Sequence, residues 1–384
     1  MSSDREGLKA DFLRRHGLVD AQRTPLAGDA STRRYERLSR PGQASLIFMD
    51  QPPVETAPCP PEASPDQRRL AGYNAMARLA AGRVDAFVAT AGWLHSQGLS
   101  APEIIAHEAG EGLAVLEDLG DDLYARLIES GTDEAPLYEA AVEVLARLHE
   151  ATPPPVLEAQ GAAWPFLTYD DLALRTGGDM FLEWWPKFSG LAPFATDAEA
   201  EWEALWAPIR ARAEAGASVF CHRDYHAENL IWLPGRNGVA RVGLLDFQDA
   251  VRAHPAWDFS MLLHDARRDV SPEREAAALA RYLEIRSDVD EAAFRADYHA
   301  LGALNSARIL FIFARQVAGF GKPRYEAFMP RTWRYLERCL AAMAWRGSAC
   351  WTSRTPLGPI RPGTSPCCFM TPAAMSRRNG RLRP

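Results

Sequence analysis

The sequence has few cysteines, no long apolar run and no signal-peptide pattern in its first residues, and each of these features argues against a class of protein. Its six cysteines form no CxxC pair, so a zinc site is not expected, and scattered thiols in a long intracellular chain are more often inert than bonded. No apolar run approaches the roughly 20 residues of a membrane-spanning helix. Residues 1–16 are charged and lack the apolar core of a signal peptide. We therefore expect a cytoplasmic protein that does not contact a membrane.

Positive charge is also in deficit over most of the chain. The formal net charge is -7 over 384 residues, which argues against nucleic acid as the main partner because phosphate backbones attract basic surfaces. The exception is residues 347–384, which contain six arginines, no lysine, no acidic residue and three of the six cysteines. Helical periodicity stops at Trp345, so we expect this atypical tail to be disordered or translated out of frame. A basic tail that binds an anionic partner is the alternative.

The order of predicted elements indicates an α+β fold. Residues 34–38 and 44–49 are predicted strands joined by a turn at Pro41-Gly42, and residues 113–120 are a predicted strand that ends at a hinge. The proline-rich residues 52–65 predict a surface loop. Helical periodicity follows at 66–96, 138–149, 178–185, 197–214, 274–282 and 291–320, with short strands within 218–251. We predict a small β-rich N-terminal lobe at 1–120, with a connector near 117–121, and a larger helical C-terminal lobe at 121–346.

One polar motif dominates the functional interpretation. Asp224 and Asn229 lie five residues apart, and Asp246 follows seventeen residues later at the end of an apolar run. Phosphoryl transfer needs a positioned hydroxyl, Mg²⁺ on the phosphates, and cations or amides near the spreading charge. We interpret Asp224 as the acceptor of the hydroxyl proton, and Asn229 and Asp246 as oxygen ligands of Mg²⁺. The alternative is a loop whose polar side chains cap turns.

Small residues before the first clear strand predict a phosphate-binding loop, because they let main-chain N–H groups approach phosphate oxygens. An ordinary turn is the alternative. Arg33 and Arg34 point in opposite directions if the chain is extended, so only one of them can face a nucleotide. Main-chain groups of the hinge at 117–119 could bond to adenine. The predicted nucleotide-binding residues are Gly28, Asp29, Ala30, Ser31, Thr32, Arg33, Arg34, Glu117 and Leu119.

The neighbours of the motif have predicted roles as well. His222 and Arg223 are expected to fix the loop, and Asp258 is expected to anchor it. Candidate acceptor-binding residues are His226, Gln248, Asp249, Glu183 and Trp184, with Trp164 and Trp185 as further rings on which a sugar could stack. Each has an ordinary alternative, because His226 could face solvent, Asp249 could cap a turn, and tryptophans are more often core residues.

Together these motifs resemble the aminoglycoside phosphotransferase family, which has a protein-kinase-like fold. Residues 222–229 and 245–247 carry the resemblance. With residues 28–35, 49–53, 116–121 and 246–250, the chain is similar, more narrowly, to the bacterial anomeric sugar kinases. Those enzymes phosphorylate N-acetylmuramate and N-acetylglucosamine at C1 in cell-wall recycling. The similarity covers roughly residues 10–345.

The resemblance implies ATP as the phosphoryl donor, Asp224 as the catalytic base, Asn229 and Asp246 as Mg²⁺ ligands, and residues 28–34 over the phosphates. It also implies a sugar 1-phosphate as product and a uridylyltransferase as the next enzyme of the pathway. Another acceptor, such as an aminoglycoside, choline or homoserine, would keep the same chemistry. An inactive nucleotide-binding module is the alternative from another class.

The sequence departs from most kinase-like folds at the third strand. Those folds place a lysine there to hold the α- and β-phosphates, whereas residues 45–50 contain none. The anomeric sugar kinases also have Met-Asp at this point, which favours that branch. Our hypothesis is that Arg33 or Arg34 replaces the lysine. The sequence predicts no role for the insertion at 54–83.

Overall fold

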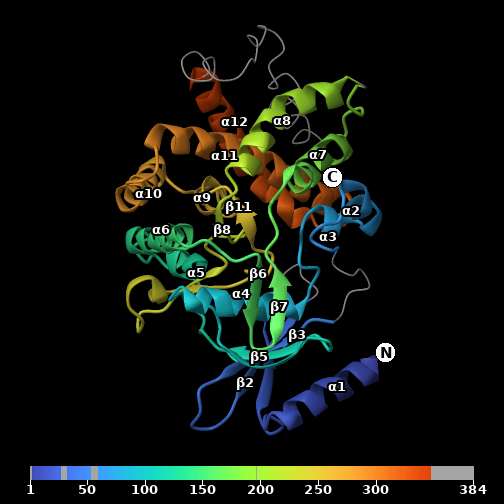
Figure 1. Cartoon of the computed structure of the whole chain (residues 1–384), viewed down its shortest axis with the longest axis vertical. Helices are drawn as coiled ribbons and strands as arrows, with labels where there is room; N and C mark the ends of the chain where they lie inside the picture. Colours follow the sequence, from blue (N-terminus) through green and yellow to red (C-terminus); the bar gives the residue numbers. More distant parts are fainter. Residues whose placement is uncertain (1, 27–32, 53–58, 196, 347–384) are drawn as a thin grey trace, which may run out of the picture. The chain divides into compact units, whose positions relative to one another are not determined.

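The computed structural model describes residues 2–26, 33–52, 59–195 and 197–346 (Figure 1). The predicted tail at 347–384 lies outside these residues. The chain forms two compact units. The first comprises Met1–Thr176, Arg210–Asp265 and Val270–Glu291, and the second comprises Gly177–Ile209, Ala266–Asp269 and the described part of Ala292–Pro384. The predicted lobe boundaries at 120 and 346 stay predictions.

A five-stranded antiparallel sheet opens the first unit. It contains β1 (Gln22–Pro25), β2 (Arg34–Ser39), β3 (Leu46–Asp50), β4 (Ile104–Glu108) and β5 (Leu113–Glu117), in the order β1-β2-β3-β5-β4. β2 pairs with β3 from Arg34 opposite Asp50 to Leu38 opposite Leu46, which confirms the predicted strand pair. Their turn contains Gly42 at φ 72°, a conformation that glycine adopts without steric cost.

Helix α1 (Ser2–Arg15) covers one face of this sheet (Figure 1). Its Phe12 and Leu13 are buried in a core with Phe48 and Val115 of β3 and β5. This helix was not predicted from the sequence, because most of its side chains are polar. Several of these polar side chains form ion pairs with residues of the sheet.

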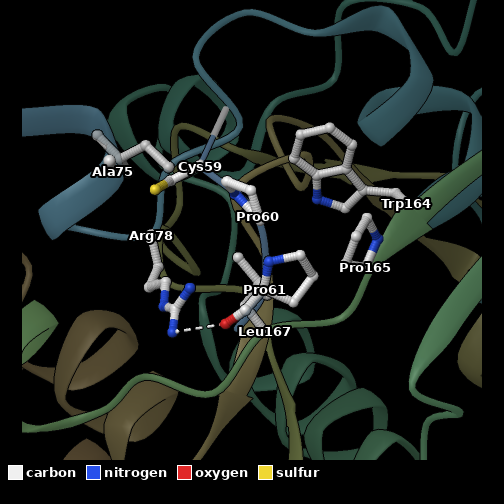
Figure 2. Close-up of a pocket in the computed structure, with 9 residues that line it drawn as sticks. Cys59, Pro60, Pro61, Ala75, Arg78, Trp164, Pro165 and Leu167 are labelled. Atoms are coloured by element: carbon white, nitrogen blue, oxygen red, sulfur yellow. Dashed lines mark hydrogen bonds between the residues drawn. The ribbon is translucent and has the colours of Figure 1, made fainter. Parts of the chain in front are cut away.

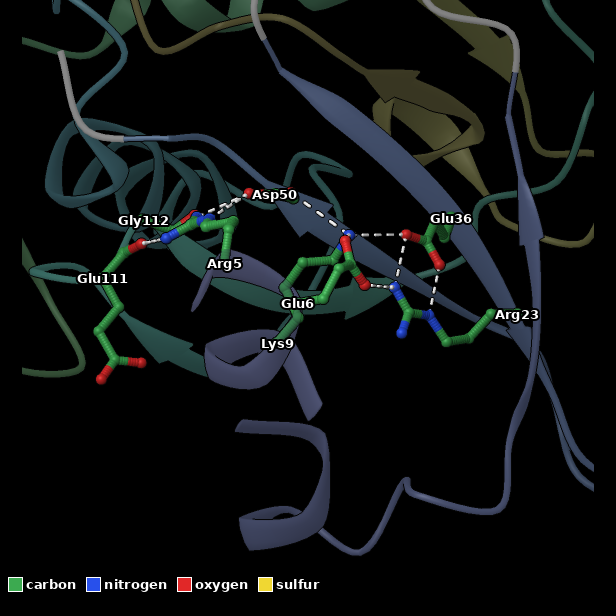
Figure 3. Close-up of polar contacts among 8 residues, drawn as sticks. All are labelled: Arg5, Glu6, Lys9, Arg23, Glu36, Asp50, Glu111 and Gly112. Carbon is green, nitrogen blue, oxygen red and sulfur yellow. Dashed lines mark hydrogen bonds and ion pairs between the residues drawn. The ribbon is translucent and has the colours of Figure 1, made fainter. Parts of the chain in front are cut away.

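Figure 3 shows these ion pairs between α1 and the sheet. Arg5 Nη2 lies 2.6 Å from Asp50 Oδ1, and Lys9 Nζ lies 3.5 Å from Asp50 Oδ2 and 3.2 Å from Glu36 Oε1. Arg23 Nε of β1 also donates to Glu36, at 2.5 Å. Asp50 at the end of β3 is therefore committed to the α1 side of the sheet.

The predicted helix at 66–96 is interrupted in the structure. It forms α2 (Pro65–Ala71), α3 (Tyr73–Met76) and α4 (Val84–Ser96), with a non-helical segment at 77–83. Ser64 and Gln67 form a capping box at the start of α2. Gly72 and Gly82 have φ of 96° and 74°, and Arg78 and Ala81 are also left-handed. These conformations end the helix, so the single-helix prediction is wrong over this stretch.

The remaining elements of the first unit carry and surround the polar motif. Helix α4 lies beside the hairpin of β6 (Val156–Ala159) and β7 (Ala162–Pro165), and α6 (Ala135–Glu150) packs against α10 (Pro272–Ile285). Short strands form two antiparallel pairs, and α5, α9 and a 3₁₀ turn complete the unit. Their bounds are β8 (Val219–Cys221), β9 (Leu230–Trp232), β10 (Val242–Leu244), β11 (Val251–Ala253), α5 (Tyr124–Glu129), η1 (Gly238–Arg241) and α9 (Ala256–Leu263).

The second unit is helical and has an aromatic core. It contains most of α7 (Asp171–Ser189), α8 (Ala198–Ala215) and α11 (Glu291–Ala318), together with η2 (Pro323–Phe328) and α12 (Met329–Arg346). Trp185 stacks on Trp333 with ring centroids 5.2 Å apart, and Phe181 stacks on Trp202 at 5.2 Å. In the described ranges, no helix is long and apolar enough to cross a membrane.

Candidate active site

The two segments that carry the motif run side by side because they are tied at both ends. Residues 222–229 leave β8 and enter β9, and residues 245–250 leave β10 and enter β11. β8 pairs with β11, with Cys221 opposite Val251, and β9 pairs with β10, with Leu230 opposite Leu244. Leu245 N also donates to Asn229 O at 2.9 Å. Asn229 and Asp246 are thus neighbours although they are seventeen residues apart in the chain.

Asp258, in the first turn of α9, anchors residues 222–229, which we call the catalytic segment after their predicted role. The sequence predicts this anchoring. Its carboxylate accepts hydrogen bonds from His222 N at 2.6 Å, Arg223 N at 2.9 Å and Cys221 Sγ at 3.2 Å. Burial raises the pKa of Asp258 to about 6, and the main-chain donors oppose that rise. Burial also raises the pKa of the Cys221 thiol well above its usual value, so this thiol is inert.

His222 has a structural role, as predicted. Its ring is buried, and Nδ1 accepts a hydrogen bond from Asp224 N at 3.3 Å. Burial lowers the pKa of His222 to about 4, so the ring is neutral near pH 7. A neutral, buried imidazole that accepts from Asp224 N therefore holds the main chain of that residue in place.

Asp224 combines an accessible carboxylate with a fixed main chain. Its side chain is 48% exposed, so a substrate hydroxyl can reach it. His226 Nε2 lies 3.4 Å from Asp224 Oδ1, and its Nδ1 accepts from Glu228 N at 3.3 Å. His226 is buried, so it supports Asp224 instead of facing solvent.

Asn229 and Asp246 have the donor atoms that Mg²⁺ prefers. Asn229 Nδ2 donates to Asp224 O at 2.9 Å, which orients the amide with its oxygen directed away from that bond. Asp246 has φ 60°, a strained value for a residue with a side chain, and such strain is typical of functional sites. Within the residues that the structure describes, no three His, Cys, Asp or Glu side chains form a metal cage. One carboxylate and one amide nevertheless fit Mg²⁺, which usually keeps water and substrate phosphates as its other ligands.

Arg33 is the cation at this site, and Arg34 is not. Arg33 Nη2 donates to Asp246 Oδ1 at 2.6 Å, and Nη1 donates to Gln248 Oε1 at 2.7 Å and to Tyr35 Oη at 3.3 Å. Burial alone would lower the pKa of Arg33, but Tyr35 and Asp246 outweigh it and the pKa is raised. Arg34 is exposed. The register of β2 therefore distinguishes two arginines that the sequence left equivalent.

Gln248 and Asp249 have protein partners within the site. Gln248 Nε2 donates to Asp246 Oδ1 at 3.0 Å, and Asp249 Oδ1 accepts from Ala80 N at 2.6 Å. Both were predicted to contact the acceptor. That role stays a prediction, and in the described structure Gln248 supports Asp246 while Asp249 holds the insertion.

The insertion, described from residue 59, is attached to the catalytic segment. Arg223 Nη1 donates to Arg78 O at 3.1 Å and to Asp249 O at 3.4 Å, and its guanidinium lies 4.4 Å from the Tyr169 ring centroid. Arg68 and Arg78 both form ion pairs with Asp170. Since main-chain atoms make several of these contacts, no side-chain pattern in the sequence could have indicated them.

A cavity of about 210 Å³ lies where the insertion meets β7 (Figure 2). Its walls are mainly apolar, and Arg78 contributes a guanidinium. Trp164, predicted as a stacking ring, is 8% exposed and forms part of this wall. The lining residues are Cys59, Pro60, Pro61, Ala75, Arg78, Leu79, Trp164, Pro165 and Leu167.

The other predicted nucleotide contacts are only partly described. Gly28, Asp29, Ala30, Ser31 and Thr32 lie outside the described residues. Glu117 Oε1 pairs with Arg236, and Glu117 N donates to Glu103 O at 2.8 Å, so this N–H already has a partner. The Leu119 side chain lies against Gly243 of β10. The hinge residues therefore adjoin the β9–β10 hairpin that carries the motif.

Two predicted acceptor contacts belong to the second unit. Glu183 pairs with Lys187 at 2.6 Å, and Lys187 Nζ lies 4.4 Å from the centroid of the Trp184 ring. Arg315 lies 6.0 Å from the same ring. This group of an aromatic ring and two cations is distinct in composition from the motif, and its predicted role in acceptor binding stays a prediction.

Comparison with known proteins now bears on the motif and the fold. The model of the phosphotransferase enzyme family matches residues 22–304, which include every residue of the motif. The chain belongs to this family. It is 65% identical over 355 residues to the N-acetylmuramate/N-acetylglucosamine kinase of Caulobacter vibrioides, covering 92% of this chain and 97% of the relative. The predicted resemblance and the prediction of a phosphotransferase are confirmed.

Solved structures with low sequence identity share the fold. Choline kinase LicA from Streptococcus pneumoniae aligns with a TM-score of 0.51 at 15% identity, over 88% of this chain and 99% of that one. The gentamicin complex of APH(2″)-IIa aligns with a TM-score of 0.51 at 13% identity, over 86% and 95%. With the antiparallel sheet in the N-terminal part and the many helices, these likenesses confirm the predicted α+β, protein-kinase-like fold.

Proposed function

We propose that this protein is an ATP-dependent kinase that phosphorylates the anomeric C1 hydroxyl of N-acetylmuramate and N-acetylglucosamine in peptidoglycan recycling. The observation that carries the proposal is the 65% identity to the C. vibrioides kinase named for these two sugars, over 97% of that protein. Fold alone does not select the acceptor, because one fold serves many substrates. We also propose a cytoplasmic location, where ATP is supplied.

In the proposed reaction, the C1 oxygen forms a bond to the γ-phosphorus, and the bond from that phosphorus to the β,γ-bridging oxygen breaks. ADP leaves with the electron pair of the broken bond, and the hydroxyl proton passes to Asp224. An anomeric hydroxyl is more acidic than an ordinary alcohol. A half-exposed carboxylate supported by His226 can therefore accept its proton late in a loose transition state.

The chain's own residues divide the remaining work. Asn229 and Asp246 would hold Mg²⁺, which when bound neutralises charge on the β- and γ-phosphates. Arg33 is proposed as the phosphate-binding cation in place of the strand lysine. Residues 28–32, Glu117 and Leu119 are proposed nucleotide contacts, and His226, Gln248, Asp249, Glu183 and Trp184 are proposed acceptor contacts. The sugar 1-phosphate product suits a uridylyltransferase as the next enzyme.

The proposal is tested by incubating the protein with ATP and Mg²⁺ and a panel of acceptors: N-acetylmuramate, N-acetylglucosamine, kanamycin and choline. We expect ADP release with the two sugars, and a phosphomonoester on C1 in the phosphorus NMR spectrum. Asp224→Asn is the matched control, and its turnover should fall by about 10²- to 10⁴-fold, the usual contribution of a general base. Phosphate on another sugar oxygen, or turnover with kanamycin or choline alone, would reject the assignment.

A further inference from the structure

The Arg33 guanidinium holds the same Asp246 carboxylate that is assigned to the divalent ion. Oδ1 of Asp246 accepts from Arg33 Nη2 at 2.6 Å and from Gln248 Nε2 at 3.0 Å. Two donors on one carboxylate oxygen use the lone pairs that a metal ion would coordinate. A metal ion at Oδ1 would therefore displace these donors, and a metal ion at Oδ2 would lie on the same carboxylate as the Arg33 guanidinium and be repelled by its charge.

Arg33 cannot simply leave the site when it gives up Asp246. Its side chain is only 12% exposed, and Arg33 directly precedes Arg34, whose main chain is held in the sheet by its pairing with Asp50. A guanidinium is always charged, and a charge with little access to water needs an anionic or polar partner. The phosphates of a nucleotide are suitable, because a planar guanidinium donates in parallel to two oxygens of a phosphate.

Gln248 is suited to accompany this exchange. Its amide oxygen accepts from Arg33 at 2.7 Å while its amide nitrogen donates to Asp246. The amide therefore keeps Arg33 beside Asp246 through a neutral contact. This contact remains available when the carboxylate binds the divalent metal ion instead of Arg33. Tyr35, two residues after Arg33, provides a second neutral contact, with its Oη 3.3 Å from Arg33 Nη1.

From these contacts we propose that Arg33 exchanges the Asp246 carboxylate for the nucleotide phosphates, so that the divalent ion and the nucleotide bind together. The inference rests on the proposed kinase function for the identity of the ligand, a nucleoside di- or triphosphate. It adds a role beyond phosphate binding, since Arg33 also limits access of the metal ion to its carboxylate ligand.

The test uses the full chain and needs no sugar. Mn²⁺ binding without nucleotide is measured by electron paramagnetic resonance, and metal-free ADP binding is measured by calorimetry in EDTA. Arg33→Gln should bind Mn²⁺ roughly tenfold or more tightly than wild type, and ADP roughly tenfold or more weakly. These are the effects of removing one charge-assisted contact. Arg34→Gln is the matched control, because the neighbouring arginine is exposed, and it should follow wild type in both titrations.

Unchanged or weaker Mn²⁺ binding by Arg33→Gln would overturn the proposal, and so would unchanged ADP binding. Thermal unfolding of each variant checks that a loss of ADP binding is not a loss of fold. Because the titrations contain no acceptor, their outcome is separate from that of the acceptor panel. A protein that gives the expected titrations and phosphorylates neither sugar would reject the proposed function while supporting the exchange by Arg33.

Discussion

Arg33 and Arg223 bring guanidinium groups to the two sides of the motif, and their partners differ in kind. Both are largely buried, with Arg223 9% exposed and the Arg33 side chain 12% exposed. Arg223 donates to two main-chain carbonyl groups and lies over a tyrosine ring. Arg33 pairs with a carboxylate that the proposed chemistry needs for another purpose. Two arginines of similar burial therefore differ in function: Arg223 makes a permanent contact with the insertion, and Arg33 makes an exchangeable ion pair with Asp246.

The partners of a buried arginine decide whether its contacts are permanent or exchangeable. Carbonyl groups of Arg78 and Asp249 have no second role in the site, so Arg223 can hold the insertion permanently. The Asp246 carboxylate has a second role as the proposed Mg²⁺ ligand, so its ion pair with Arg33 is exchanged during the proposed cycle. Variants on the two sides should consequently affect different quantities, stability on the insertion side and ligand binding on the phosphate side.

The largest expected effect follows from removing the shared anion on the phosphate side. Asp246→Ala should lower kcat by about 10³-fold, the scale seen when a group that stabilises transition-state charge is lost. It should lower the unfolding temperature only modestly, because the Asp246 side chain is 35% exposed and Arg33 keeps its contacts with Gln248 and Tyr35. ADP release and thermal unfolding measure the two quantities. A large loss of stability with little loss of kcat would contradict the distinction between the two sides.

The opposite pattern is expected on the insertion side. Arg223→Met keeps the apolar stem but leaves the Arg78 and Asp249 carbonyl groups without their donor. It should lower the free energy of unfolding by about 2–3 kcal/mol, the cost of buried groups left unsatisfied. Chemical denaturation gives this value. Arg223→Lys should recover only part of it, because an ammonium lacks the planar geometry of the guanidinium. An Arg223→Met variant as stable as wild type would mean that the contacts of Arg223 with the two carbonyl groups do not stabilise the fold.

The anchor of the catalytic segment should make stability depend on pH. The pKa of Asp258 is raised to about 6 from 3.8, so its contribution to folding is fully present below pH 3.8 and is lost as the pH rises through 6. Compared with Asp258→Asn, wild type should lose about 2 kcal/mol of relative stability between pH 4 and pH 8. Denaturation of both proteins across this range measures the difference. A stability of wild type relative to Asp258→Asn that increases as the pH rises would contradict the predicted direction.

The smallest effect is expected at Tyr35. Tyr35→Phe removes the 3.3 Å contact from Arg33 Nη1 and leaves its contacts with Asp246 and Gln248 in place. The affinity for metal-free ADP should change by about threefold or less, as for one weak neutral hydrogen bond. A change as large as that of Arg33→Gln would place the main contact of Arg33 at Tyr35 and weaken the comparison.

The sequence predicts those parts of this molecule that depend on local pattern. The strand pair β2–β3 was predictable because its apolar alternation and Pro-Gly turn are contiguous. Asp224, Asn229 and Asp246 were recognisable because the β9–β10 hairpin converts a short spacing into proximity. Helix α1 was not, because most of its residues are polar and their partners lie in β1, β2 and β3, far away in the sequence.

Contacts between distant segments account for what the sequence could not predict. Alternation along β2 allowed either Arg33 or Arg34 to face the site, and only the Asp246 contact, 213 residues away, distinguishes them. The role of the insertion depends on Ala80 N and Arg78 O, and main-chain atoms leave no residue-type signal. The functions of Glu183 and Trp184 stay predictions, since the partners described for them are the cations Lys187 and Arg315 of the second unit.

The ion pairs of Lys9 have a practical consequence for chemical labelling. Lys9 is the only lysine of the first unit, and its amine is 5% exposed between Glu36 and Asp50 on the α1 side of the sheet. Nucleotide analogues that acylate an amine beside the phosphates should therefore find no target in this unit. Dicarbonyl reagents such as phenylglyoxal, which modify guanidinium groups, should instead inactivate the protein, with ADP as the protecting ligand. Surveys of kinases based on lysine acylation would overlook an enzyme of this design.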